Sequence, residues 1–169
     1  MQESNNMKIT HIKGIHFSLP FSVKCSSKQT IEWTVDFTDA TYDVGMPDQY
    51  DWNKLCGIKW NYFQPRKDAL MVGWRYINNR YELCLYIHRN SSFNPPSEPL
   101  VVTDKLAKIT LSLDEVQKTA TLTIVGNDLD SKKSQTIDWD LFDKYWFINS
   151  WFGGNKVPNR TVKFNLDQK

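Results

Sequence analysis

Residues 68–88 constrain the fold of this chain more than any other part of its sequence. Two runs rich in β-forming residues flank Asn78 and Asn79, and asparagine tolerates the positive φ angles of a two-residue hairpin turn. Side chains alternate between the two faces of a strand, so one face of the predicted hairpin must be buried. That face collects the apolar residues Leu70, Val72, Trp74, Leu83, Leu85 and Ile87.

The opposite face of this hairpin is polar. It carries Arg75, Glu82, Tyr86 and His88, and Gly73 leaves a gap among them. The turn places Arg75 directly opposite Glu82, where the two residues either form a cross-strand ion pair or bind a ligand. Such a face is either solvated or a binding surface, and the sequence leaves both alternatives open.

The rest of the chain also alternates with a period of two, and helical patterns are scarce. The clearest run, residues 30–38, puts Ile31, Trp33, Val35 and Phe37 on one side. Further strands are predicted at residues 15–19, 55–60, 108–113, 119–125, 134–139, 145–152 and 162–166.

Turn and loop signals separate these strands at short intervals. Prolines predict a loop at residues 90–99, and residues 39–51 are also predicted to be a loop. Residues 145–152 are apolar on both faces and so predict a central strand, whereas residues 139–144 are the helix candidate. This arrangement predicts an all-β fold: a two-sheet antiparallel β-sandwich of the jelly-roll type.

Length and charge narrow the class of protein. A chain of 169 residues with 40% hydrophobic residues can bury one core, so we expect a single domain with a flexible N-terminus over residues 1–10. The net charge of +2 comes from interspersed charges, which gives no signal for a nucleic-acid partner. No segment reaches membrane-spanning length, so no membrane insertion is predicted. Residues 1–8 lack the apolar core of a leader, yet a trimmed secreted chain would look the same, and the location stays open.

The cysteines indicate neither a disulfide framework nor a metal site. Cys25, Cys56 and Cys84 are an odd set without a CxxC pair, so free thiols are predicted. A structural Ca²⁺ would want oxygen ligands such as the acidic residues Asp36, Asp39, Asp43, Asp48 and Asp51. Because their spacing is not that of an EF-hand, solvated loop acids are the default and no cofactor is predicted.

Three segments follow one another in an order that suggests a family: Val72-Gly-Trp-Arg-Tyr76, Glu82-Leu-Cys-Leu-Tyr-Ile-His88, and Trp151-Phe-Gly-Gly-Asn155 with Pro158 before the last predicted strand. The chain thereby resembles a group of small, largely uncharacterised bacterial and bacteriophage proteins of the concanavalin-A-like lectin/glucanase superfamily. The resemblance covers roughly residues 50–166 and implies the jelly roll that alternation also predicts. It implies glycan binding on the outer face of one sheet, since the superfamily includes lectins, glycoside hydrolases and polysaccharide lyases.

The candidate ligand-binding residues are Arg75, Glu82, Tyr86, His88, Asn149 and Trp151. Aromatic faces stack on pyranose rings, and the polar side chains of this set can bind hydroxyl groups. The chain is therefore interpreted as a non-catalytic, lectin-like module with a polysaccharide or other glycan as its partner. The alternative is a structural or adhesive part of a virion or surface assembly, in which Trp52 or Tyr62-Phe63 would contact other protein subunits.

Enzymatic alternatives rest on weaker patterns, and whether the chain is an enzyme is left uncertain, with a non-enzyme favoured. A retaining glycosidase needs two carboxylates about 5 Å apart, but Glu32 and Asp36 on one strand face would lie over ~13 Å apart. A polysaccharide lyase needs a Tyr or His base and an Arg, and Tyr86-Ile-His88 is similar to the Gln-Ile-His strand of alginate lyases. Their C-terminal Tyr-Phe-Lys pattern is replaced here by Trp151-Phe-Gly-Gly.

Overall fold

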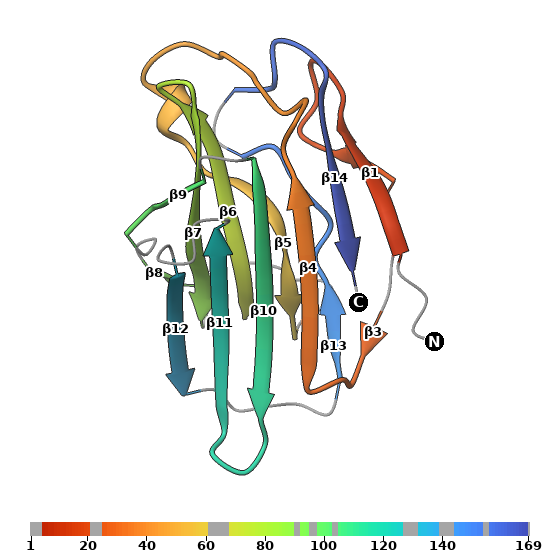
Figure 1. The fold of residues 1–169 in the computed structure, drawn as a ribbon, viewed down its shortest axis with the longest axis vertical. Helices are drawn as coiled ribbons and strands as arrows, with labels where there is room; N and C mark the ends of the chain where they lie inside the picture. The colour runs from red at the N-terminus through yellow and green to blue at the C-terminus, as the bar shows by residue number, and fades with distance from the viewer. Residues whose placement is uncertain are drawn as a thin grey trace.

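The computed structural model describes residues 5–20, 25–60, 68–89, 92–94, 98–102, 105–126, 132–138, 144–153 and 156–168. Strands dominate these ranges, and their one helical element is the 3-10 turn η1 (Asp48–Tyr50). No helix within these ranges is long and apolar enough to cross a membrane. The strands form two antiparallel sheets stacked as layers (Figure 1).

Sheet A is the layer nearer the viewer in Figure 1. In spatial order its strands are β12 (Lys132–Asp138), β11 (Thr119–Gly126), β10 (Leu106–Asp114), β4 (Thr30–Asp36), β14 (Val162–Gln168), β1 (Asn5–His11) and β2 (Ser18–Leu19). The two ends of the described chain meet in this sheet, because Asn5 lies opposite Gln168. Apolar residues such as Ile109 and Leu111 point inward, whereas the outward positions of β10 and β4 are mostly Thr, Ser, Lys and Glu.

Sheet B is the second layer. Its strands are β3 (Cys25–Ser26), β13 (Tyr145–Phe147), β5 (Asn53–Lys59), β6 (Ala69–Ile77), β7 (Arg80–Arg89) and β8 (Ser92–Asn94), and β9 (Leu100–Val102) also pairs with β7. β6 and β7 form the predicted hairpin, with Ile77 opposite Arg80 and positive φ at both Asn78 and Asn79. The register and the inward set of six apolar residues are confirmed.

Residues 15–19 link the two sheets along one side of the sandwich. β2 pairs with β1 of sheet A. Phe17 forms a bridge with Trp151, and Trp151 forms a second bridge with Lys54 of β5 in sheet B. Strand pairing therefore continues from sheet A into sheet B through this segment.

β5 has an irregular register near its start, and at Gly57 it comes unusually close to β6. The register between β5 and β6 shifts between Lys54 and Cys56, and Gly57 has a φ of +144°. A Cβ atom at this position would lie 2.2 Å from the carbonyl oxygen of Leu70. Only glycine fits such a close approach of two strands.

Several expectations differ from the structure. Residues 5–11 form β1, not a flexible terminus, because β14 supplies backbone partners that a polar sequence does not reveal. β8 pairs with β7 inside the predicted 90–99 loop, and β3 and β9 were not predicted. The predicted strand at 145–152 is regular only over β13. Residues 139–143 of the helix candidate lie outside the described ranges.

Candidate functional site

The polar face predicted for the hairpin exists, and part of the chain packs over it. The register brings Arg75, Glu82, Tyr86 and His88 to the outer face of sheet B. Glu82 is only 4% exposed and His88 only 9%. This is not a solvated strand surface, and residues 50–52, just before β5, account for part of its cover.

The indole of Trp52 fills the gap at Gly73. A Cβ atom on Gly73 would lie 3.4 Å from Cε3 of Trp52 and 2.8 Å from Sγ of Cys84. The guanidinium carbon of Arg75 lies 4.2 Å from the centre of the Trp52 ring, a cation–π contact. The absence of a side chain at Gly73 therefore lets a tryptophan lie against the sheet.

Arg75 and Glu82 form an ion pair that also holds the covering chain. Nε and Nη2 of Arg75 both donate to Oε2 of Glu82, at 2.8 and 2.7 Å. Nη1 of Arg75 donates to the carbonyl oxygen of Tyr50 at 2.9 Å. The second carboxylate oxygen of Glu82 accepts from Nε of Arg80 at 3.2 Å. The structure thus shows the cross-strand ion pair that the sequence left as one of two alternatives.

Buried hydrogen bonds anchor the loop that leads into this cover. Oε1 of Gln49 accepts from the N–H of Val44 at 2.8 Å, and its amide nitrogen donates to the carbonyls of Tyr42 and Tyr76. The hydroxyl oxygen of Tyr42 accepts from Nδ2 of Asn53 at 2.8 Å. Burial raises the pKa of Tyr42 to about 12, so its hydroxyl stays neutral and acts as a structural group.

One row of directly opposed residues crosses the outer face of sheet B and reaches the linking segment. The row runs through Phe17, Trp151, Lys54, Gly73 and Cys84. Directly opposed residues point to the same face, so Phe17 and Trp151 extend the polar face of the hairpin. Their rings meet edge to face with centroids 4.6 Å apart. Nζ of Lys54 lies 4.5 Å from the centre of the Tyr86 ring, so the row also contacts the next outward residue of β7.

Exposed aromatic side chains gather on this side of the molecule. Three aromatic side chains are exposed among the residues whose side chains the structure describes, and all three lie here: Phe17 (55%), Tyr50 (52%) and Trp151 (38%). His16 stacks on Trp151, with centroids 6.0 Å apart and an interplanar angle of 17°. We name this surface the aromatic face; it consists of Phe17, Tyr50, Trp52, Tyr86 and Trp151 with Lys54 and Arg75 between them.

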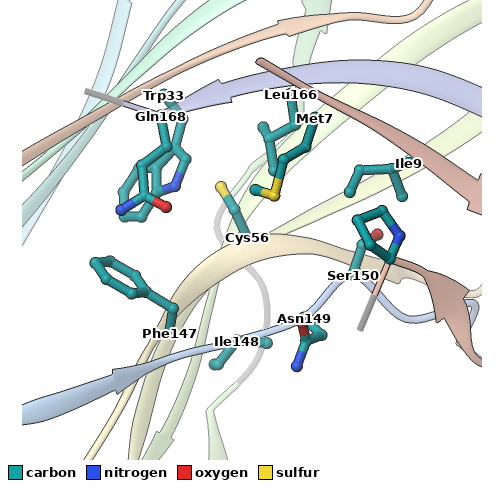
Figure 2. Close-up of a pocket in the computed structure, with 11 residues that line it drawn as sticks. Met7, Ile9, Trp33, Cys56, Phe147, Ile148, Asn149, Ser150, Leu166 and Gln168 are labelled. Atoms are coloured by element: carbon teal, nitrogen blue, oxygen red, sulfur yellow. The ribbon is translucent and has the colours of Figure 1, made fainter. Parts of the chain in front are cut away.

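Asn149, the remaining predicted ligand residue, lies at a small cavity between the sheets (Figure 2). The cavity has a volume of about 30 Å³ and apolar lining residues such as Met7 and Trp33. The side-chain amide of Asn149 points away from Cys56 in Figure 2. Such a volume fits a water molecule and is too small for a sugar.

The thiols of Cys56 and Cys84 are not reactive in this environment. Cys56 and Cys84 are free and buried. Burial raises the pKa of the Cys56 thiol far above its ordinary value and that of Cys84 to about 12. Both therefore stay protonated and poorly nucleophilic at neutral pH.

The acidic loop does not converge on a cation within the part of the chain that the structure describes. No group of three or more His, Cys, Asp or Glu side chains there could hold a metal ion. Asp36 instead accepts from the N–H of Thr38, and Asp43 from the N–H of Gly45, both at 2.9 Å. These carboxylates stabilise their own turns, and the Ca²⁺ hypothesis gains no support from them.

Sequence reasoning missed Phe17, Tyr50 and Lys54 as members of this face, and it considered Trp52 only as a contact for a partner chain. Each reaches the face through pairing or packing with residues distant in sequence, for which periodicity gives no signal. The run Tyr62-Phe63, considered with Trp52, lies outside the described residues.

Comparison with known proteins identifies the fold. No family model matches the sequence, and no curated protein matches it. The whole chain superimposes on 87% of a functionally unknown protein from Saccharomyces cerevisiae, with a TM-score of 0.58 and 9% identity. Two Bacteroides proteins also match: Xyloglucan PUL GH43B of B. ovatus (TM-score 0.53, 8% identity, 83% of this chain) and the bifunctional GH43-CE protein of B. eggerthii (0.54, 11%, 87%).

The chain spans only 27% and 17% of the two Bacteroides proteins. At these identities the likeness concerns the fold alone. Together with the two seven-stranded antiparallel sheets, it shows the jelly-roll β-sandwich that the sequence predicts.

Proposed function

We propose that the protein is a non-catalytic carbohydrate-binding module whose ligand lies on the aromatic face. The observation that carries this proposal is the gathering of the exposed aromatic side chains Phe17, Tyr50 and Trp151 on one side of sheet B. Exposed aromatic rings stack on the C–H faces of pyranoses. The outer face of sheet A offers no such ring among its described residues.

Polar groups lie beside these rings, as sugar recognition requires. The ammonium group of Lys54 lies next to the Tyr86 ring and donates to the carbonyl oxygen of Trp52 at 3.2 Å, and its further hydrogens can donate to a sugar. The guanidinium of Arg75 lies over Trp52 but is held by Glu82 and Tyr50. A binding site of this kind combines apolar stacking with a few donors that bind hydroxyls. The name of one structural neighbour, Xyloglucan PUL GH43B, makes xyloglucan a rational first ligand to test.

Affinity electrophoresis in gels containing xyloglucan, alginate or other polysaccharides tests the proposal. We expect retarded migration of the wild-type protein in at least one gel, and loss of this retardation in Trp151→Ala. The matched control is Leu106→Ala, because Leu106 is equally exposed, at 38%, but lies on the outer face of sheet A. Normal migration of the folded protein in every gel, or equal retardation of Trp151→Ala, would overturn the proposal.

A structural or adhesive role is the second candidate, and one observation favours it. In residues 15–19 the apolar side chains Ile15, Phe17 and Leu19 are exposed, while Ser18 is buried. An exposed apolar strip of this kind is typical of protein contacts. Sedimentation of the wild-type chain and of Leu19→Asp distinguishes this role, since only a protein contact predicts assembly that the charge abolishes.

The described geometry gives a lyase no specific support. Arg75, which would neutralise a uronate, binds Glu82 and Tyr50, and the candidate base His88 is almost fully buried. Incubation with alginate, followed by ultraviolet absorbance of an unsaturated product, tests this alternative directly. A rising absorbance that Tyr86→Phe abolishes would replace the binding module with an enzyme.

A further inference from the structure

A buried histidine lies directly beneath the aromatic face. His11 of β1 is 0% exposed and points into the space between the sheets. Its ring centroid lies 6.1 Å from that of Trp74, 5.8 Å from that of Phe152 and 5.6 Å from that of Phe164. An imidazole in such a dry aromatic cluster needs a hydrogen-bond partner, because a buried polar atom without one is costly.

Ser150 is that partner. Oγ of Ser150 lies 3.0 Å from Nε2 of His11 and donates its hydrogen to the carbonyl oxygen of Lys54 at 2.8 Å. The serine hydrogen is thus already used, so Nε2 of His11 donates to Oγ and carries the proton of the neutral ring. Nδ1 then holds a lone pair, for which the described residues offer no hydrogen-bond partner.

The same hydrogen bonds position Trp151. The carbonyl of Lys54 that accepts from Ser150 also accepts from the N–H of Trp151 at 2.9 Å, and the N–H of Lys54 donates to Trp151 at 2.8 Å. A second buried hydroxyl, that of Ser18, donates to the carbonyl of Ser150. The position of the exposed indole therefore depends on a chain of contacts that begins at the imidazole of His11.

A second proton on His11 has no place in this arrangement. The groups that face the imidazole are the rings of Trp74, Phe152 and Phe164 and the hydroxyl of Ser150. None of these carries a charge, and burial alone lowers the pKa of His11 to about 4. Protonation would place a charge and an unpaired N–H donor at Nδ1 inside an aromatic cluster. The free-energy cost of this buried group can be reduced only if the surrounding segment moves.

We propose that His11 is a positioning residue for Trp151, and that its protonation releases residues 150–152 and weakens ligand binding at the aromatic face. The part of this inference that concerns ligand rests on the proposed function. Because one proton is involved, affinity falls by up to about tenfold for each pH unit between the ordinary pKa of histidine and about pH 4, and no further below it. The release is local, so the two sheets keep their structure while it occurs.

Fluorine NMR of the protein labelled with 5-fluorotryptophan tests the positioning. Trp151→Phe assigns the resonance, which is then followed from neutral pH to about pH 4, with far-ultraviolet circular dichroism recorded on the same samples. We expect the Trp151 resonance to shift in the wild type while the circular dichroism is unchanged. In His11→Gln, whose amide can still donate to Ser150 but cannot titrate, we expect a resonance that no longer follows pH.

Two further variants keep the test decisive if His11→Gln does not fold. Ser150→Ala retains the histidine but removes its link to the strand, so the shift on acidification should disappear. Ser18→Ala removes a hydrogen bond to the same segment but leaves the imidazole and its partner Ser150 in place. In this variant the Trp151 resonance should shift with the same pH midpoint as in the wild type. An identical pH course in the wild type and in a folded His11 or Ser150 variant, or loss of circular dichroism at the same pH, would overturn the inference. A pH-dependent Trp151 without any polysaccharide binding would overturn the proposed function and leave the positioning role standing.

Discussion

The outer faces of the two sheets arise from the same alternation of residues, yet they differ in what they expose. On sheet A, outward side chains meet solvent, as in the ion pair of Lys108 with Glu32, whose side chains are 54% and 37% exposed. On sheet B, the corresponding pair of Arg75 with Glu82 is 15% and 6% exposed. The difference arises because the chain before β5 packs on sheet B, whereas the described outer residues of β4 and β10 remain open.

The linking segment makes the contrast sharper. On sheet A, leucines such as Leu111 point into the core and polar residues point out. In residues 15–19 the pattern is inverted: Leu19 is 51% exposed, while Ser18 is buried against the hydrogen bonds of Ser150. Alternation therefore determines which residues share a face, but the partner across that face decides whether the face is buried.

The largest difference in stability is expected between truncation of a leucine in sheet A and truncation of a leucine in the linking segment. Leu111→Ala empties a fully buried position and should lower the free energy of unfolding by about 2–5 kcal/mol. Leu19→Ala should change it by no more than about 0.5 kcal/mol, because the side chain is exposed. Urea unfolding of both variants measures the difference. Similar losses in the two variants would show that Leu19 is covered in solution. The inverted pattern of residues 15–19, with leucine exposed and serine buried, would then not hold.

The two glutamates give the next largest contrast. Glu82→Gln leaves Arg75 without its charged partner in a mostly buried position, and we expect a loss of about 3 kcal/mol. Glu32→Gln breaks an exposed pair and should cost less than about 1 kcal/mol. Chemical denaturation at low and moderate salt checks both values. A Glu82 variant as stable as the Glu32 variant would mean that solvent reaches the outer face of sheet B.

Much of the fold, and less of the site, could be predicted from sequence. The hairpin register follows from Asn78-Asn79 and a period of two, and both are local properties. The cover on Gly73 could not be predicted, because it depends on Trp52, which comes from a different segment. For the same reason the sequence identified Trp151 as a candidate but not its neighbour Phe17, which meets it only through the pairing of the linking segment.

Acid should destabilise the interior beside the linking segment through His11. Its folded-state pKa of about 4 lies below the ordinary value of 6.5, so the neutral imidazole is required by the native state. The stability that this provides is present above pH 6.5 and is lost as pH falls toward 4, by at most about 3 kcal/mol. Urea midpoints measured across this pH range in the wild type and in His11→Gln isolate the contribution of His11 to the free energy of unfolding. Parallel pH profiles would assign the acid sensitivity to the carboxylates instead.

The smallest contrast concerns two serines on opposite sides of the sandwich. Ser18→Ala removes a buried donor from the carbonyl of Ser150, which should cost about 1 kcal/mol. Ser112→Ala changes an exposed hydroxyl on sheet A and should be within about 0.5 kcal/mol of the wild type. Because neither serine titrates, both losses should be the same near neutral pH and near pH 5. A loss at Ser18 that grows on acidification would couple this hydroxyl to the imidazole of His11, and the polar cluster would then respond to protons as one unit.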